Sequence, residues 1–447
     1  MTPQRYLLSL TVLSLVGVTG CGDEPSKQFA DANPNVDARL GDAALDAPAA
    51  GVVKAVSIRF GEIVPGATVI FQNADGSTIS TKTTDANGEA TETMLPGGTV
   101  NIVLEQTFTK RKTVAFGGPT NEVISFVGVK PGDVLRSGDL FAVAPMMSHQ
   151  INLPTVPGVS RIEIATSCGN AFLINEPPFL IDLETGCTTA NMLVVMRDAN
   201  NGTLGTFYKG NVTIPASGAI ELSTEPLLAD STFNVSATNV PADINSLNMY
   251  IARSAGRIEG ATDNAFFQPE TVAATNTGTV QIYGATAPDL LAQTNYFRAN
   301  GGFQQLVELV APSTAYALDF AGQVLPWFDS QPALNLATSE VTWTESAGAA
   351  PEAIQFRATT FRQAAGFSFA RTVIAPYQLG SLKIPKLPGP AAKYDFIADD
   401  NPNLGVALIK VGVGYDVLRP LLAHPFDRST LQGQRGRARV SYSNFGE

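Results

Sequence analysis

Thr84-Asp85-Ala86-Asn87-Gly88-Glu89-Ala90 decides the fold class, because it places an Asn-Gly turn between two runs in which polar and apolar residues alternate. Such a dipeptide between alternating runs is the strongest short-range signal of a β-hairpin. A second turn, Asp75-Gly76, lies upstream, and a third, Leu95-Pro96-Gly97-Gly98, lies downstream. Three hairpin turns within about forty residues predict an antiparallel β-sandwich in this part of the chain.

The rest of the chain follows the same pattern of short apolar runs and turns. Its 40 Gly and 29 Pro separate runs that are rich in Thr, Val, Ile and Phe, which favours short strands joined by tight turns. Arg161-Ile162-Glu163-Ile164-Ala165 alternates, and Met192–Met196 is typical of a buried strand. The best helix-like stretch, Ala287–Tyr296, is short. We therefore predict a mostly β protein built from tandem antiparallel β-sandwich domains.

The first of these domains carries a family resemblance. Pro65-Gly66-Ala67-Thr68-Val69, the turn around Asn87-Gly88, and Pro96-Gly97-Gly98 together resemble the carboxypeptidase-regulatory-like module, and almost as well the bacterial immunoglobulin-like (Ig-like) domain. The resemblance implies a transthyretin-like or Ig-like sandwich without catalysis of its own. It covers about forty residues and says nothing about the remaining chain.

The N-terminus has the order of an export signal. Arg5 precedes an apolar run from Tyr6 to Val18, and this run is shorter than the roughly 20 residues that a membrane span needs. Val18-Thr19-Gly20-Cys21 then resembles the lipobox of bacterial lipoproteins, in which the cysteine is acylated and becomes the first mature residue. An ordinary signal peptide with a coincidental cysteine is the alternative.

The lipobox resemblance carries an expected location. In the family, Asp directly after the cysteine retains the protein at the inner membrane, whereas Gly22 stands here. The resemblance therefore implies a protein of the cell envelope, held at the membrane by its N-terminal lipid, in the outer membrane or at the cell surface.

The chain divides into five predicted segments. Between Gly22 and about Ala50 it is rich in Asp, Ala, Pro and Asn, a composition that cannot bury enough apolar surface to fold. As a flexible tether this segment has a reach on the order of 30 Å. The predicted organisation is a signal peptide (1–20), a flexible acidic linker (21–50), the carboxypeptidase-regulatory-like or Ig-like sandwich (51–145), a second β domain with a disulfide (146–325) and a third β domain (326–447).

The two other cysteines predict a disulfide. Cys168 and Cys187 are the pair that remains once Cys21 is acylated, and an exported protein meets an oxidising compartment. A metal pair or a reactive thiol would need His or further Cys nearby, and the region offers none.

Composition limits the functions that remain. Charged residues make up 15% of the chain and the net charge is −11, so nucleic acid is not an expected partner. The only histidines are His149 and His424, without companions at ligand spacing, and no nucleophile, zinc-protease or phosphate-loop motif is present. Asp85 and Asn87 lack the further carboxylate of an EF-hand-type loop. We therefore predict no catalytic residue, no metal and no cofactor.

Near the C-terminus, basic and aromatic residues suggest ligand contacts. Arg435, Arg437 and Arg439 fall on one face of a predicted strand, where they could hold a phosphate or an acidic polysaccharide. A solvated strand face is the plainer interpretation. Trp327 and Trp343 could stack on sugar rings, although buried positions in a sandwich core are the default.

Two functional hypotheses remain. The first is a lipid-anchored envelope protein that acts as a binding or scaffold module for a polysaccharide, an envelope component or a protein. The second is a carboxylate-dependent hydrolase of extracellular polymer, since paired carboxylates meet in space and leave no sequence spacing. Two carboxylates about 5 to 9 Å apart in a cleft would distinguish the second hypothesis.

Overall fold

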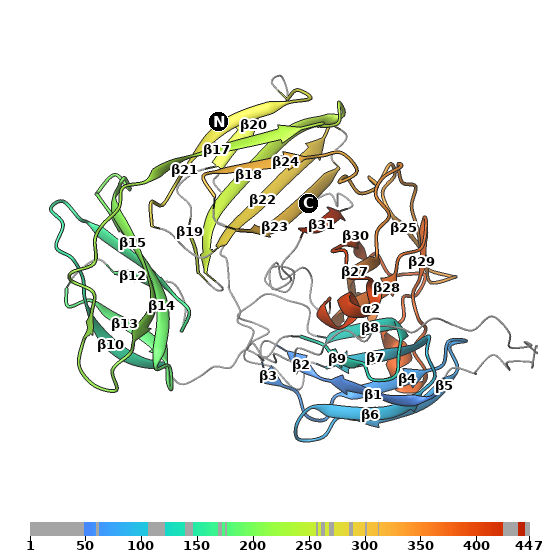
Figure 1. Ribbon diagram of the computed structural model, residues 1–447. Helices are drawn as coiled ribbons and strands as arrows, with labels where there is room; N and C mark the ends of the chain where they lie inside the picture. Colours follow the sequence, from blue (N-terminus) through green and yellow to red (C-terminus); the bar gives the residue numbers. More distant parts are fainter. Residues whose placement is uncertain are drawn as a thin grey trace, which may run out of the picture.

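The computed structural model shows a mostly β protein, as the sequence predicts (Figure 1). The described residues are 49–59, 62–105, 121–138, 146–168, 172–174, 177–255, 258–260, 264–267, 272–285, 289–299, 302–311, 313–422 and 437–442. Helical structure in this part of the chain is confined to four short segments: η2 (Gln363–Ala365), η3 (Gly389–Tyr394), α2 (Tyr415–Leu418) and η4 (Arg419–Leu421). None of these helices has the length and hydropathy of a membrane span.

One 13-stranded sheet runs through the body. Neighbouring strands in it are antiparallel, except that β8 and β28 are parallel. In spatial order its strands are β5 (Thr78–Thr83), β4 (Thr68–Gln72), β7 (Gly98–Leu104), β8 (Asn121–Val129), β28 (Phe367–Pro376), β27 (Ala353–Arg362), β30 (Asn403–Lys410), β31 (Arg437–Tyr442), β23 (Phe303–Val310), β22 (Asp289–Arg298), β18 (Ile244–Ala255) and β19 (Ile258–Gly260), with β20 (Asn264–Phe267) beside β18.

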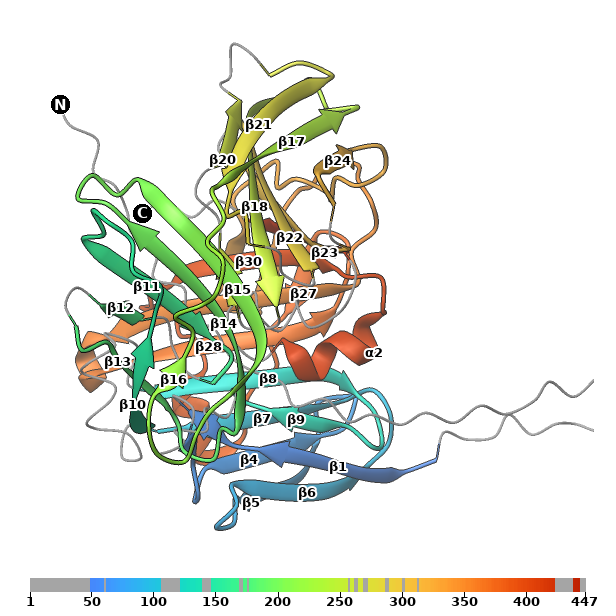
Figure 2. The same cartoon turned by 60° about the vertical axis from the view of Figure 1, so that its left-hand side comes forward.

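One face of this sheet is covered by N-terminal strands. These are β1 (Gly51–Val56), β6 (Glu89–Met94) and β9 (Val134–Arg136), with the short pair β2 (Ile58–Arg59) and β3 (Glu62–Ile63) nearby. The first core lies between the layers and combines Val53 and Phe71 with Ile374, Ile409 and Val440. Residues from both ends of the chain therefore share one core, and Figure 2 shows the blue N-terminal strands below the orange C-terminal ones.

The opposite face is covered by residues that follow Trp327. They include β25 (Ala333–Asn335), β26 (Glu340–Thr342) and β29 (Ser381–Lys383), together with η3. Their side chains, among them Trp343, pack on Phe356 and Phe369 in a second core. Because this part of the sheet is covered on both faces, β7 is buried at every position.

A third core forms a separate sandwich, seen at the left of Figure 1. Apolar residues alternate inward in its strands, as in β11. One sheet contains β13 (Leu180–Glu184), β10 (Met146–Asn152) and β16 (Ile220–Glu221), and the other contains β12 (Phe172–Ile174), β11 (Arg161–Thr166), β14 (Thr189–Arg197) and β15 (Thr203–Thr213).

A fourth core lies where a three-stranded sheet covers the second half of the large sheet. The covering strands are β21 (Asn276–Ile282), β17 (Ser231–Thr238) and β24 (Ala315–Asp319). Tyr296 and Trp327 meet edge to face inside it, with ring centroids 5.8 Å apart. Both tryptophans of the chain are buried, Trp327 to 2% and Trp343 to 5% exposure. The helix-like stretch Ala287–Tyr296 contributes its described residues to β22, because pairing on both sides outweighs local propensity.

The turn at Asp85–Gly88 has the expected backbone. Asp85 Oδ1 accepts hydrogen bonds from the N–H groups of Asn87 and Glu89, and Gly88 has a φ of +70°. The same arrangement recurs at Asp198, whose Oδ1 accepts from Asn200 and Gly202. Here Asn201 takes the positive φ, which Asn tolerates better than most residues.

The predicted boundaries at 145/146 and 325/326 stay predictions. Two findings bear on how the segments are connected. Segments 51–145 and 326–447 contribute to the same first core, and segment 146–325 supplies the third core and, together with Trp327, the fourth.

Candidate functional site

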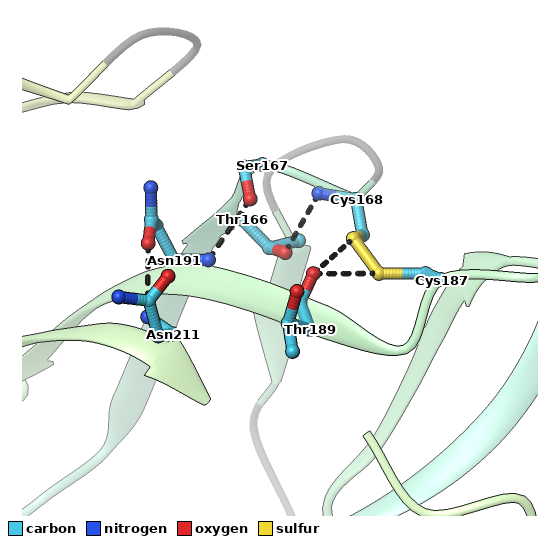
Figure 3. The surroundings of a disulfide bond; sticks show 7 residues. All are labelled: Thr166, Ser167, Cys168, Cys187, Thr189, Asn191 and Asn211. Atoms are coloured by element: carbon cyan, nitrogen blue, oxygen red, sulfur yellow. Dashed lines mark hydrogen bonds between the residues drawn. A yellow bond between two sulfur atoms is a disulfide. The ribbon is translucent and has the colours of Figure 1, made fainter. Parts of the chain in front are cut away.

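Two of the predicted site residues form a covalent link. Cys168 follows β11 and Cys187 precedes β14, and a disulfide joins them with a Cα–Cα distance of 6.1 Å (Figure 3). Both sulfur atoms lie 3.2 Å from the carbonyl oxygen of Thr189. The Cys168 N–H donates to Thr166 Oγ1 at 3.1 Å, so the loop that carries the disulfide is also held to the end of β11.

The remaining predicted residues lie partly outside the described residues. Cys21, Arg435 and His424 all do, whereas Arg437 begins β31. Arg439 is half-buried in β31, and its Nη1 donates to the carbonyl oxygen of Gln323 at 3.5 Å. His149 lies on β10 and is only 5% exposed, not on the surface.

A buried polar cluster surrounds Arg371. This side chain projects from the middle of β28 and is fully buried. Its Nη1 donates to Asp395 Oδ1 at 3.0 Å and its Nη2 to the carbonyl oxygen of Pro385 at 2.9 Å. Asp395 also accepts from the N–H of Leu387. Burial nevertheless raises the pKa of Asp395, and the charge of Arg371 offsets only part of that effect.

A second arginine holds the next carboxylate. Arg362, at the end of β27, donates from Nε and Nη2 to the two oxygens of Asp400, at 3.0 and 2.6 Å. Its guanidinium lies 5.2 Å from the centroid of the Phe369 ring, a cation–π distance. Burial alone would raise the pKa of Asp400, but the hydrogen bonds from Arg362 and from the Ile397 N–H hold it below its usual range.

A third carboxylate connects this cluster to the N-terminal strands. Glu105, directly after β7, accepts from the Tyr394 hydroxyl at 2.8 Å and pairs with Lys393 at 2.8 Å. The hydrogen bond from Lys393 lowers the pKa of Glu105, while burial and the Glu105 carboxylate raise the pKa of Tyr394. We call Arg371, Arg362, Asp395, Asp400 and Glu105 the arginine–carboxylate network.

A second buried arginine fixes the C-terminal helix. Arg419 is fully buried and donates to Asp133 Oδ2 at 2.5 Å and to the carbonyl oxygen of Gly128 at 2.8 Å. It also donates to Asp416 Oδ1 at 3.0 Å. A hydrogen bond from Lys130 and those from Arg419 lower the pKa of Asp416. The helix α2 is thereby fixed to the turn between β8 and β9.

The chemistry of the network is charge neutralisation. Asp395 and Asp400 are each held by an arginine and by a backbone N–H, and the Asp400 side chain is 1% exposed. A glycosidase pair must instead flank a substrate and exchange protons with it. Among the described residues, no group of three or more His, Cys, Asp or Glu could hold a metal ion.

Sequence reasoning missed this network, although one signal was present. Arg371 stands in the middle of Phe367–Ile374, a stretch rich in Phe, Val and Ile, and a charged residue within a buried strand needs a partner. The partners lie at positions that no spacing rule connects to Arg371.

One further arginine is buried without such a partner. Arg253 on β18 is 9% exposed, and burial alone lowers its pKa. Its Nε has no hydrogen-bond partner, and no acidic group in the described ranges raises its pKa.

Comparison with known proteins adds little to this description. No protein family matches the chain, and no curated protein matches it either. Among solved structures, the Bacillus anthracis TIE protein is 12% identical with a TM-score of 0.13, and the alignment covers 60% of this chain and 49% of that protein. This chain thus spans about half of that protein's length.

Two other solved structures cover a similar share of this chain. A protein described as an adhesin of Bacteroides ovatus is 11% identical with a TM-score of 0.14, and covers 64% of this chain and 97% of its own. BcpA, the major pilin subunit of Bacillus cereus, is 10% identical with a TM-score of 0.13, and covers 61% of this chain and 99% of its own. Likenesses with such TM-scores carry no argument here.

Proposed function

We propose that this chain is a lipid-anchored protein of the cell envelope whose β body binds or scaffolds an envelope polysaccharide or protein. The signal run and the lipobox resemblance at Cys21 support the anchor. The acidic, Pro-containing linker 21–50 would hold the body clear of the lipid. An anchor of this kind raises the local concentration of the body at the envelope, so that binding alone is sufficient for function.

One observation carries the binding and scaffold part of the proposal. The 13-stranded sheet contains strands from the first, second and third predicted domains. Arg371 and Arg419 are fully buried, and their hydrogen bonds join the C-terminal strands and helix to the N-terminal ones. A body linked in this way presents faces and loops in a fixed arrangement, which suits recognition of an extended partner.

The anchor is tested by metabolic labelling with a radioactive fatty acid. The wild-type chain is expected to incorporate the label, and Cys21→Ser is expected to lose it. Cys168→Ser is the matched control, because it also removes one cysteine but should keep the label. Incorporation into Cys21→Ser would contradict the anchor.

Binding is tested with immobilised residues 49–447, which include every described residue. Purified envelope polysaccharide and an extract of envelope proteins are passed over the chain separately, and saturable retention of one of them is expected. The retained polymer should keep its length. Shortening of the polymer that stops when one specific Asp or Glu is neutralised, in a variant that still folds, would favour the hydrolase. Retention of neither fraction would contradict the proposal.

A further inference from the structure

One face of the large sheet carries a row of three aromatic rings. Phe297 on β22 and Tyr442 on β31 each lie opposite Phe303 on β23, and these three strands lie side by side in Figure 1. The rings of Phe297 and Phe303 stack with centroids 4.9 Å apart, and those of Phe303 and Tyr442 with centroids 5.2 Å apart. The three rings therefore form one continuous stack across three strands.

The Phe297 end of this stack is open. Phe297 is 37% exposed, although its side chain is large and apolar. Phe303 covers one side of its ring, and on the other side its cross-strand neighbour is Ser246 of β18. A serine side chain is too short to cover an aromatic ring. The outer face of the Phe297 ring is therefore available to a further group of matching shape.

A row of amide side chains lies beside the stack, on the same face of the sheet and two residues along each strand. Asn248 on β18 lies opposite Asn295 on β22, and Asn295 lies opposite Gln305 on β23. Asn295 Oδ1 accepts from Gln305 Nε2 at 2.8 Å and from Gln293 Nε2 at 3.2 Å. Its Nδ2 group has no acceptor among the described residues. Asn295 thus offers an unused hydrogen-bond donor next to the ring.

Asn248 offers the complementary group. Its Oδ1 atom is buried and accepts no hydrogen bond from the part of the chain that the structure describes, although the residue as a whole is half-buried. An acceptor in this state costs free energy, which a bound donor would recover. Because Cβ atoms of directly opposite residues lie about 5 Å apart, one ligand can reach Asn248 and Asn295 together.

This combination of groups fits a sugar. The faces of a pyranose ring carry C–H groups that pack on an aromatic ring, and its hydroxyls both donate and accept hydrogen bonds. One hydroxyl could donate to Asn248 Oδ1 while another accepts from Asn295 Nδ2. The aromatic row and the amide row contain no charged side chain, so the carboxylate of an acidic sugar would lose water there without gaining a cation. The chemistry therefore favours an uncharged sugar.

We propose that the open face of Phe297 and the amides of Asn248 and Asn295 bind an uncharged sugar unit of a polysaccharide. We call these residues, with Ser246 beside them, the sugar site. The inference rests on the proposed function, because it names the class of partner and the surface that the envelope-binding body would use. Stacking on Phe303 holds the Phe297 ring in place before a ligand arrives, which lowers the ordering cost of binding.

Calorimetric titration of residues 49–447 with hexasaccharides tests the sugar site. The uncharged probes are maltohexaose, cellohexaose, mannohexaose and xylohexaose, and the charged probe is hexagalacturonate. We expect at least one uncharged probe to bind and hexagalacturonate not to bind. Phe297→Ala should weaken that binding about tenfold through loss of the ring contact. Ser246→Trp should weaken it as well, because the new side chain would cover the Phe297 ring while leaving it in place.

Two further variants separate binding from folding. Phe361→Ala is the matched control, since Phe361 is 65% exposed on β27, which three strands separate from β22. It should bind the probe as the wild type does. Asn248→Leu should weaken binding without lowering the urea midpoint, because it removes an acceptor that has no donor in the described chain. A residue that served only the packing of the sheet would show the opposite pattern.

Three results would overturn the sugar site. They are equal affinity of an uncharged probe for the wild type, Phe297→Ala and Ser246→Trp, binding of hexagalacturonate alone, and binding of no probe. The proposed function is decided separately by the immobilised chain. Retention of an envelope polysaccharide or protein there would leave the proposed function standing without the sugar site, and retention of neither would contradict the proposed function itself.

Discussion

Replacing Gly88 with alanine tests whether the turn at Asp85–Gly88 requires a residue without a Cβ atom. Gly88 has a φ of +70°, where an L side chain costs about 1–2 kcal/mol. A Cβ atom at this position would lie 2.9 Å from Ser57 O and 2.9 Å from Ile63 Cγ2. Ser57 O cannot move freely, because it accepts the Val64 N–H at 2.9 Å. Forcing the extra methyl group into this packed site should therefore destabilise the folded state by about 1–3 kcal/mol more.

Gly76 provides the matched control. It also has a positive φ, +84°, but nothing lies within 4 Å of a Cβ atom built there. Gly76→Ala should therefore be destabilised only by the positive φ, whereas Gly88→Ala should be destabilised by the positive φ and by the close contacts of its Cβ atom. The expected difference between the two variants is about 1–3 kcal/mol.

Amide hydrogen exchange of residues 49–447 measures this difference locally. A change of about 1.4 kcal/mol corresponds to a tenfold change in the opening equilibrium. We expect amides of Glu89–Met94 in Gly88→Ala to accelerate at least about fivefold more than amides of Thr78–Thr83 in Gly76→Ala. Equal acceleration in the two variants would refute the steric part of the reasoning, and no acceleration in either would refute the turn geometry itself.

Three further predictions concern covalent and charged groups. Peptide mapping without reductant should recover Cys168 and Cys187 as one linked pair, and free thiols at both positions would contradict this. Replacing both cysteines with alanine should destabilise the separate sandwich around the third core by about 3 kcal/mol in urea unfolding. Arg253→Met should raise the free energy of unfolding by about 1 kcal/mol or more, since it removes a buried charge for which the described residues provide no acidic partner. A loss of stability would contradict this. The pKa of Asp400 is lowered in the folded state. The contribution of Asp400 to folding stability is therefore present above the unfolded pKa and is lost as the pH falls through the folded pKa. Asp400→Asn should therefore flatten the decline in stability as the pH falls below about 4, the ordinary pKa of an aspartate, in acid titrations. An unchanged slope would contradict the assignment.

Local features of the fold could be predicted from the sequence because they depend on neighbours in the chain. The alternation in Arg161-Ile162-Glu163-Ile164-Ala165 falls within β11, and the apolar run Met192–Met196 is buried in β14. The turn at Asp85–Gly88 and the cysteine pair follow in the same way. In each case the deciding residues lie within about twenty positions of each other.

Long-range pairing could not be predicted, because period-two patterns do not name a partner strand. β8 pairs in parallel with β28, with Asn121 opposite Phe369. β31 completes the sheet between strands from two other regions. The contacts between the arginine–carboxylate network and the N-terminal strands depend on such long-range pairing, since the β8–β28 pairing brings Ser125 within 3.5 Å of Arg371.

The position of β1 determines how the body responds to mechanical load. The strand begins at Gly51, immediately after the predicted tether, and is flanked by β6 on one side and β9 on the other. Tension that arrives along the tether pulls β1 along its own axis. Its ladder hydrogen bonds lie roughly across that axis, so they share the load in shear and do not open one by one. In the proposed lipid-anchored form, a body attached in this way would resist being pulled apart from the end that carries the tether.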